Sequence, residues 1–478
     1  MTYHSVVDDP QCLQTSSASW KAELKHLLSL AGPMIFALFM ESLHNTISVV
    51  LVGQIDSPLV TEYVDAATMA SMFMSITSFS VGIGLSSALD TLCTQAHGAG
   101  NTKQFGVYFQ SSHLGMALIL VPVVVLNWFS GDILAAWGQD EEISALAGTF
   151  TRYVTIGLPF YYVYQLIRRF LQAYDIVFPM TVVAVLSNGV HIGLGYYLCH
   201  HTSLGFNGAA IARCVSYVVL PLFMAPYFVL KPIHREWGLH WNSAVAVANL
   251  REFFRFGIPG LLMVMMEYTA FEILTLMAGW LPNHKVMIGV NSVIINLITM
   301  FYMVYLGISF SGTIRIGNLL GANKPEEARR VALMALCLSA SCSLITAGTM
   351  LFARHQLPKV FINDPEVVEA ASEAILCMLV LHIIDTLNAV NQGIFRAIAK
   401  PVIATVVNAA TYYPIGISMA AACAFGLGWD VNGLFIGFTT GALTACALYA
   451  WQLRKIDWSK AATEAVTRSA PSITTLSV

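Results

Sequence analysis

The sequence predicts an all-α polytopic membrane protein whose twelve transmembrane helices form two parallel six-helix repeats around a central cavity. Three observations support this prediction. Hydrophobic residues make up 56% of the 478 residues and charged residues only 11%, whereas soluble domains carry about 25% charged residues. The apolar residues fall into twelve long runs. The second half of the chain also repeats motifs of the first half at a nearly constant distance.

The twelve apolar runs define the expected spans. Each is long enough to cross about 30 Å of hydrocarbon as a helix. The runs lie at 27–52, 66–90, 106–129, 147–171, 179–199, 207–230, 252–280, 286–311, 330–352, 367–395, 401–425 and 432–453. Residues 1–26 are polar, so we expect no cleavable signal, and the first span should serve as its own insertion signal.

The distribution of Lys and Arg predicts the direction of these spans. If the N-terminus is cytoplasmic, the inside segments, counted together with the span ends that adjoin them, hold 19 of the 24 Lys and Arg residues, among them Arg168, Arg169 and Arg396. The outside segments hold three, and the remaining two, Arg152 and Arg213, fall within spans. Because cytoplasmic loops carry an excess of positive residues, we expect both termini in the cytoplasm.

The two halves of the chain repeat each other along six spans. Matching residues include Pro33 and Pro259, Glu41 and Glu267, and Gly53 and Gly279 at a separation of 226; Gly84 and Gly307, Ser86 and Ser309, and Gly98 and Gly321 at 223; Asp140 and Asp364, and Ala173 and Ala397 at 224; and Asn207-Gly208 and Asn432-Gly433 at 225. A nearly constant separation over this length indicates duplication. Each half has an even number of spans, so both insert in the same direction as parallel repeats.

This repeat predicts the domain organisation. Residues 1–26 form a cytoplasmic N-terminal segment, 27–230 an N-lobe with spans one to six, and 252–453 a C-lobe with spans seven to twelve. Residues 231–251 link the lobes and could lie on the membrane surface as an amphipathic helix. Residues 454–478 form a Ser/Thr-rich cytoplasmic tail.

Two acidic residues near the middle of spans are the strongest candidates for a functional site. Glu267 lies in the seventh span, and its repeat mate Glu41 lies in the first. A carboxylate at the centre of a membrane helix costs about 2.5 to 3.5 kcal/mol, and burial favours the neutral acid, so such a group can exchange protons. Glu272 is about 140° from Glu267 around the helix, so both reach one cavity only if the helix is broadly exposed or kinked, for instance at Pro259.

The tenth span carries a further acid, Asp385. Asn388, Gln392 and Arg396 share its helix face, and Arg396 should lie about 16 Å closer to the cytoplasm, too far for a direct ion pair. His382, one turn before Asp385, could hydrogen-bond to it or carry a proton. We therefore assign proton or cation coupling to Glu267, Asp385, Glu41, Glu272 and His382.

Neutral polar and aromatic side chains in the same spans are candidates for the wall of a substrate cavity. They are Asn45, Tyr268, Phe271, Asn291, Asn296, Asn388 and Gln392. Aromatic rings could hold an organic cation. The alternatives are that the amides form hydrogen bonds between helices and that the rings simply pack. The GxxxG pairs Gly189/Gly193 and Gly437/Gly441 predict close contacts between helices.

Several classes of function are excluded. The chain has no GxxxxGK[ST], HExxH or GxSxG motif, so we expect neither ATP-driven pumping nor hydrolysis, no catalytic residue, and no cofactor. The nine Cys show no CxxC spacing, which argues against a metal site or a disulfide framework. A net charge of -3 argues against nucleic acid as a partner. An ion gradient remains as the source of energy.

Four motifs together resemble those of the multidrug and toxic compound extrusion (MATE) transporters, in the branch typical of eukaryotes. They are "ALDTLCTQAHGAGN" from Ala88, "IRIGNLLGAN" from Ile314, "MEYTAFE" from Met266 and "LHIIDTLNAVNQGIFRA" from Leu381. The likeness covers about residues 27–458, and the motifs occur in the order found in the family.

The resemblance implies a twelve-helix antiporter that expels organic cations or xenobiotics in exchange for protons. The family's two carboxylates on the seventh span match Glu267 and Glu272, and its His-x-x-acid motif on the tenth matches His382 and Asp385. Asn296 replaces an acid that many animal members carry on the eighth span. Glu41 supplies the first-span acid that is usual in bacterial members.

This resemblance leaves alternatives open. They are sodium coupling, a neutral or anionic cargo such as a flavonoid conjugate or an organic acid, and a lipid or oligosaccharide flippase, which would need basic residues in its cavity. We expect a monomer that binds small, amphipathic, cationic molecules and lies in the lipid bilayer of the plasma or vacuolar membrane.

Overall fold

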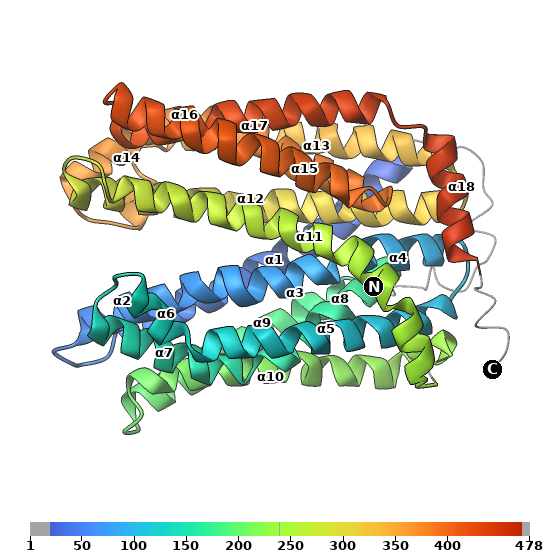
Figure 1. Ribbon diagram of the computed structural model, residues 1–478, viewed down its shortest axis with the longest axis horizontal. Helices are drawn as coiled ribbons and strands as arrows, with labels where there is room; N and C mark the ends of the chain where they lie inside the picture. Colours follow the sequence, from blue (N-terminus) through green and yellow to red (C-terminus); the bar gives the residue numbers. More distant parts are fainter. Residues whose placement is uncertain (1–19, 239, 471–478) are drawn as a thin grey trace.

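The computed structural model describes residues 20–238 and 240–470, and these residues form helices joined by short loops. Figure 1 shows two bundles of helices that run along the long axis of the molecule. Each bundle has its own hydrophobic core, and the two cores are built almost entirely from the first and the second half of the chain. This division matches the two repeats expected from the sequence.

The first bundle contains the helices before residue 231. They are α1 (Trp20–Gly53), α2 (Val60–Met74), the π-helical turn η3 (Ser75–Phe79), α3 (Ser80–Ser86), α4 (Ala88–Gly98), α5 (Gln104–Trp128), α6 (Ser130–Ala136), α7 (Glu141–Thr155), α8 (Leu158–Ala173), α9 (Phe178–His200) and α10 (Phe206–Leu230). The predicted second span lies in α2, η3, α3 and the start of α4. The predicted fourth span is divided between α7 and α8, with a break at Ile156 and Gly157.

The second bundle follows a short linker. Its helices are α11 (Ser243–Ala278), α12 (His284–Gly321), α13 (Pro325–Phe352), α14 (Pro365–Ala397), α15 (Pro401–Thr411), the π-helical turn η6 (Tyr412–Ile417), α16 (Ser418–Ala421), η7 (Ala422–Gly426), α17 (Asp430–Arg454) and α18 (Trp458–Ser469), with the 3-10 turn η5 (Pro358–Val360) between α13 and α14. In the described part of the chain, eleven helical segments are long and apolar enough to cross a membrane. With the divided fourth span, they account for the twelve predicted crossings.

The linker differs from the amphipathic helix that the sequence led us to expect over 231–251. It forms the 3-10 turn η4 (Ile233–Trp237), and α11 already begins at Ser243. Trp237 is buried against the N-lobe and donates a hydrogen bond from its indole nitrogen to the Tyr174 hydroxyl at 3.0 Å. Asn242 caps α11, because its side-chain oxygen accepts from the backbone nitrogens of Ala244 and Val245.

The repeat is visible at the ends of helices. Asp140 and Asp364 both stand before a helix and accept hydrogen bonds from the backbone nitrogens two and three residues later, which is N-cap chemistry. The repeat mates Ala173 and Ala397 end α8 and α14. Residues that match in sequence therefore also match in local structure.

Glycines let the lobes approach closely at one end of the molecule. A Cβ atom on Gly98 would lie 1.9 Å from the Asn318 backbone oxygen, and one on Gly321 would lie 2.0 Å from the Gln95 backbone oxygen. Gln95 and Asn318 are themselves 223 residues apart, as are Gly98 and Gly321. The contact is thus reciprocal, as expected for two repeats related by a twofold axis.

The predicted GxxxG contacts are confirmed at one pair and wrong at the other. A Cβ atom on Gly437 would meet the Ala420 backbone at 2.4 Å, and one on Gly441 would meet the Gly416 backbone at 2.6 Å. Nothing lies within 4 Å of a Cβ atom on Gly189 or Gly193. That stretch of α9 has open space where the motif predicts a neighbouring helix.

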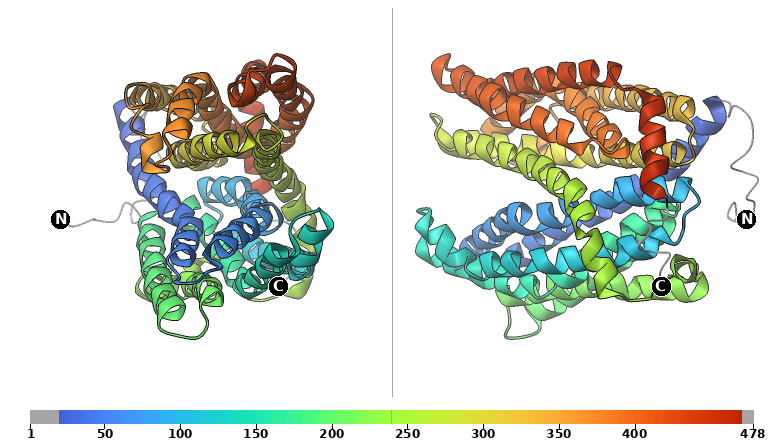
Figure 2. Two further views of the ribbon diagram at one scale, coloured as in Figure 1. Left: turned by 90° about the vertical axis from the view of Figure 1, so that its left-hand side faces the viewer. Right: turned by 45° about the vertical axis from the view of Figure 1, so that its right-hand side comes forward.

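Polar contacts join the lobes at the same end. Arg315 on α12 donates to both carboxylate oxygens of Glu23 on α1, at 2.9 and 2.6 Å. Helix α18 also crosses this end, where Arg468 donates to Gln95 and Asn101 donates to the Ser469 carbonyl. The bundles diverge away from α18 (Figure 2).

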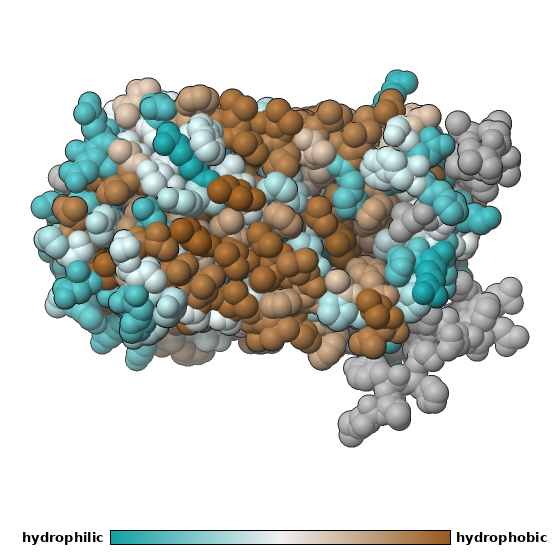
Figure 3. All heavy atoms as spheres, turned by 90° about the horizontal axis from the view of Figure 1, so that it is seen from below, coloured by the Kyte–Doolittle hydropathy of each residue, from teal (hydrophilic) through white to brown (hydrophobic). Residues whose placement is uncertain are grey.

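The outer surface has the pattern of a membrane protein. Figure 3 shows hydrophobic residues across the middle of the molecule and hydrophilic residues gathered towards both ends. The eight Cys of the described chain are free thiols, and Cys12 lies outside the described residues. No described group of three His, Cys, Asp or Glu side chains could hold a metal ion.

Candidate functional site

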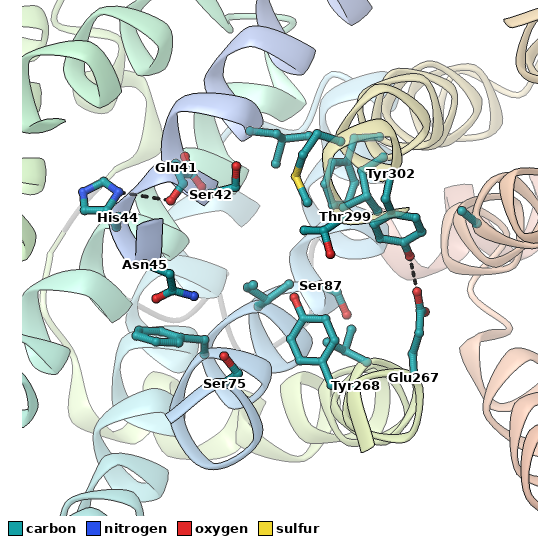
Figure 4. A pocket seen from close by; sticks show the side chains of 18 of the residues that line it. Glu41, Ser42, His44, Asn45, Ser75, Ser87, Glu267, Tyr268, Thr299 and Tyr302 are labelled. Carbon is teal, nitrogen blue, oxygen red and sulfur yellow. Dashed lines mark hydrogen bonds between the residues drawn. The ribbon is translucent and has the colours of Figure 1, made fainter. Parts of the chain in front are cut away.

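A cavity of about 390 Å³ lies between the two lobes, within the usual range of small-molecule sites. Its wall comes from α1, η3, α3, α8 and α10 on one side and from α11, α12 and α14 on the other. The charged residues that line it are Glu41, Arg168, Arg169, Arg213, Glu267, Glu272, Asp385 and Arg396. Figure 4 shows side chains of both lobes pointing into this space.

The C-lobe side carries two of the acids that the sequence singled out. Glu267 on α11 is 7% exposed and Asp385 on α14 is 8% exposed, and both line the cavity. The Tyr302 hydroxyl donates a hydrogen bond to Glu267 (Figure 4). Among the described residues, no Lys or Arg nitrogen lies within 4.0 Å of either carboxylate.

Glu272 lies in the wall of the same cavity. Helix α11 runs without interruption from Ser243 to Ala278 although it contains Pro259. The cavity is therefore lined by a broad strip of α11 that includes Val264, Tyr268 and Phe271 between and beside the two acids. Broad exposure of this helix, as the sequence allowed, brings both carboxylates to one space.

The N-lobe side differs at the repeat mate of Glu267. Arg168 on α8 forms an ion pair with Glu41 at 2.5 Å, and the Tyr164 hydroxyl donates to the same carboxylate at 2.9 Å. The side chains of Arg168 and Glu41 are only 3% and 16% exposed. The sequence assigns Glu41 to proton or cation coupling, but in the structure a buried cation is already paired with its carboxylate.

His382 lies outside the cavity wall. Its Nε2 atom is 2.5 Å from the Tyr305 hydroxyl and 2.9 Å from the Thr346 hydroxyl, in the interface between α12, α13 and α14. A residue three positions before Asp385 is displaced by about 60° around the helix. That displacement turns His382 towards neighbouring helices while Asp385 faces the cavity.

The predicted neutral wall residues divide into two groups. Asn45, Tyr268, Phe271 and Gln392 line the cavity. Asn291, Asn296 and Asn388 are not in its wall: Asn291 donates to the Thr275 hydroxyl, Asn296 donates to the Ser292 carbonyl of its own helix, and Asn388 donates to the Ala442 carbonyl of α17. For Asn291 and Asn388 the alternative reading, hydrogen bonding between helices, is the one observed.

The sequence pattern did not identify Arg168, Arg169 and Arg396 as site residues, although all three line the cavity. Asp90 on α4 lies 3.0 Å from Arg169 on α8 and 3.4 Å from Arg396 on α14, so it joins the two lobes. Both guanidinium groups also lie over the Phe310 ring. The positive-inside count assigned Arg168, Arg169 and Arg396 to the cytoplasmic side, at or just beyond the ends of their spans, although all three are buried. The shared helix face of Asp385, Gln392 and Arg396 was the signal that could have placed Arg396 here.

Comparison with known proteins agrees with this architecture. The MatE family profile matches residues 33–197 and 259–422, one block in each repeat. The chain is 31% identical to Protein DETOXIFICATION 14 of Arabidopsis thaliana over 443 residues, covering 93% of this chain and 90% of that protein. It is 30% identical to Multidrug and toxin extrusion protein 1 of Homo sapiens, covering 95% of this chain and 78% of that protein.

Solved structures show the same fold. The crystal structure of the eukaryotic MATE transporter AtDTX14 matches with a TM-score of 0.87 at 32% sequence identity, covering 94% of this chain and 99% of that chain. A MATE crystal structure in complex with MaL6 matches with a TM-score of 0.81 at 17% identity. The second likeness shows the fold alone.

Proposed function

This chain belongs to the MatE family of membrane transporters for small molecules, and from that premise we propose that it exports organic cations and other xenobiotics in exchange for protons. The observation that carries the proposal is the pair of buried acids, Glu267 and Asp385, which share a cavity and have no basic partner within ion-pairing distance among the described residues. An unpaired buried charge is costly. A proton or a cationic cargo relieves that cost, so the two compete for the site.

The exchange cycle follows from this competition. When the cavity faces the cytoplasm, the ionised carboxylates attract a lipophilic cation. When it faces an acidic outside or a vacuole lumen, protonation of Glu267 and Asp385 removes the attraction and the cargo leaves. The Tyr302 hydroxyl holds the Glu267 side chain in place. Apolar wall residues such as Phe271, Ile295 and Ile298 bind the uncharged part of the cargo.

We assign the end that carries α18 to the cytoplasm, in keeping with the excess of Lys and Arg in the segments on that side. The described conformation, with its lobes in contact there, is then the one that faces away from the cytoplasm. We further propose that both termini are cytoplasmic and that the protein acts as a monomer in the plasma or vacuolar membrane.

Uptake of a fluorescent organic cation into proteoliposomes tests the proposal. We expect uptake driven by a pH gradient, and we expect Glu267→Gln to abolish it, because an amide cannot exchange a proton. Glu373→Gln, on the exposed side of α14, removes an acid of the C-lobe outside the cavity and should leave uptake unchanged. Full pH-driven uptake by the Glu267 variant would refute the role of this residue.

The same uptake assay also tests whether sodium replaces the proton and whether the cargo is an anion. A sodium gradient that drives uptake at equal pH on both sides would replace proton coupling. Asp385→Asn should weaken binding of the cation about ten-fold, the effect of one charge-assisted contact, with little change in thermal stability. Unchanged affinity for the cation, together with transport of a flavonoid conjugate or an organic acid, would move the cargo to the anionic class.

A further inference from the structure

The N-lobe side of the cavity contains a buried arginine without an acidic partner. Arg213 on α10 has 0% exposure and lines the cavity. It donates to the Ser71 and Tyr217 hydroxyls at 3.0 Å each and to the Asn45 side-chain oxygen. No Asp or Glu oxygen lies within 4.0 Å of it in the described part of the chain. Its guanidinium group therefore has hydrogen-bond acceptors but no negatively charged partner among the described residues.

The surroundings of Arg213 do not supply a negative charge. The Phe79 and Tyr217 rings lie 5.3 and 5.8 Å from the guanidinium carbon, which gives a modest cation–π attraction. Glu41 is one turn before Asn45 on α1 but is already paired with Arg168. Other ionisable groups on this side, such as His44 and His191, stack on one another and are neutral or basic. An arriving anion would be the missing counter-charge.

Asn45 links the buried Arg213 to the surface of the cavity through a hydrogen bond. A guanidinium group only donates hydrogen bonds, so Asn45 must turn its carbonyl oxygen towards Arg213. Its side-chain NH2 group is then left to face elsewhere, and no described residue accepts a hydrogen bond from it. Asn45 is partly exposed and lies in the wall of the cavity, opposite Glu267 (Figure 4).

The charges of the two lobes are consequently opposed across one cavity. Glu41 pairs with Arg168, and the single Asp90 carboxylate is shared by Arg169 and Arg396, so one net positive charge stays in that group. Of the charged residues in the N-lobe wall, Arg213 is the one without any acidic partner among the described residues. On the C-lobe wall Glu267, Glu272 and Asp385 remain. A molecule that bridges the lobes meets an amide donor backed by a cation at one end and carboxylates at the other.

We propose that Asn45 and Arg213 form an anion subsite, which selects amphipathic zwitterions whose amine faces Glu267 and Asp385 and whose carboxylate accepts from the Asn45 amide. The subsite rests on the proposed function, since it names the class of cargo for the same cavity. Charge-assisted hydrogen bonds to a carboxylate are about twice as strong as neutral ones. The subsite would therefore favour a zwitterion over the corresponding simple cation.

A matched pair of ligands tests this subsite at equilibrium, without any ion gradient. The probes are an aryl-piperazine that bears a ring carboxylate, which is a zwitterion at neutral pH, and its methyl ester, which is a cation of the same skeleton. Each displaces a bound fluorescent cation from the purified protein. The measured quantity is the half-displacing concentration of the ester divided by that of the acid, a ratio that is insensitive to the fraction of folded protein.

Two variants act on the subsite by different routes. Arg213→Gln removes the positive charge of the subsite. Asn45→Asp places a carboxylate beside Arg213, which neutralises the guanidinium group and repels the carboxylate of the zwitterion. We expect each to lower the ester-to-acid ratio about ten-fold. Ser71→Ala removes a neutral partner of Arg213 but keeps the charge, and should change the ratio by less than about two-fold.

The outcomes separate this inference from the proposed function. If Arg213→Gln fails to fold, Asn45→Asp decides alone. An unchanged ratio in the variants that fold would overturn the subsite, as would a preference for the ester in the unmodified protein that Asn45→Asp does not alter. If Glu267→Gln retained pH-driven transport, proton coupling at Glu267 would fail while a ten-fold loss of the ratio would still support the subsite.

Discussion

The two lobes place the same kind of residue in opposite electrical settings. Glu41 and Glu267 are repeat mates at a separation of 226. At the separation of 224 that relates Ala173 to Ala397, Arg168 corresponds to Gln392. Glu41 is therefore held by a cation, whereas the position beside Glu267 carries a neutral amide. The two repeats share one scaffold, and a single difference of partner leaves one acid in an ion pair and the other without a basic partner among the described residues.

A second difference lies two turns away on the same helix face. At the same separation of 224, Tyr161 in the N-lobe corresponds to Asp385 in the C-lobe, and both line the cavity. At the separation of 225 that relates Asn207 to Asn432, Arg213 corresponds to Phe438. The C-lobe thus has an acid where the N-lobe has a phenol, and the N-lobe has a cation where the C-lobe has a ring. The opposed charges of the cavity correspond to few differences between the two repeats.

The largest expected effect comes from making the C-lobe resemble the N-lobe. Gln392→Arg gives Glu267 the partner that Glu41 has, so the carboxylate should stay ionised and paired. We expect pH-driven uptake to fall more than about 100-fold, as for Glu267→Gln, because an ion pair at this site blocks both proton and cargo. Gln392→Met is the matched control for size. Retention of uptake by Gln392→Arg would break the comparison.

The next largest effect on uptake is expected at the two glycines where the lobes meet, and it should be similar for both. Gly98→Ala and Gly321→Ala each place a methyl group within about 2 Å of a backbone oxygen of the other lobe, so the lobes cannot close at that end. Uptake should fall about ten-fold or more in both variants, and by similar factors because the contact is reciprocal. Gly189→Ala, which meets open space, is the control. A loss at only one of the two glycines would contradict the reciprocal contact.

The ion pair of the N-lobe gives the next effect, on stability. Arg168→Gln leaves the Glu41 carboxylate without a counter-charge and should lower the free energy of unfolding by about 3 kcal/mol. Glu41→Gln in the same protein should restore most of this loss, because no charge then remains. Thermal denaturation of the single and double variants checks the result. Equal stability of all of them would show that the pair contributes nothing.

The smallest effect is expected where the C-lobe has His382 and the N-lobe has Leu158, its mate at 224. His382→Leu copies the N-lobe residue. The Tyr305 and Thr346 hydroxyls lie 2.7 Å apart and can still bond to each other. Uptake should stay within about three-fold and keep its dependence on the pH gradient. Loss of the dependence on the pH gradient would show that His382 takes part in proton coupling.

The spans, the duplication and the mid-span acids Glu267 and Asp385 could all be identified from the sequence. Length and hydropathy are properties of one segment, and the cost of a carboxylate in lipid can be read from the run that contains it. For that reason Glu267 and Asp385 could be named before any neighbour was known. The break between α7 and α8 and the path of the linker left weaker signals, because they depend on local packing.

Which charges are compensated depends on contacts between helices that are far apart in the chain. Arg168 is 127 residues from Glu41, and Arg213 is 168 residues from Asn45, so helical periodicity within one span says nothing about either pairing. Counting Lys and Arg by segment assigned Arg168, Arg169 and Arg396 to the cytoplasmic side, whereas the folded helices bury all three side chains. The energy of a buried charge depends on the groups within a few ångströms of it, and those groups come from helices that only folding brings together.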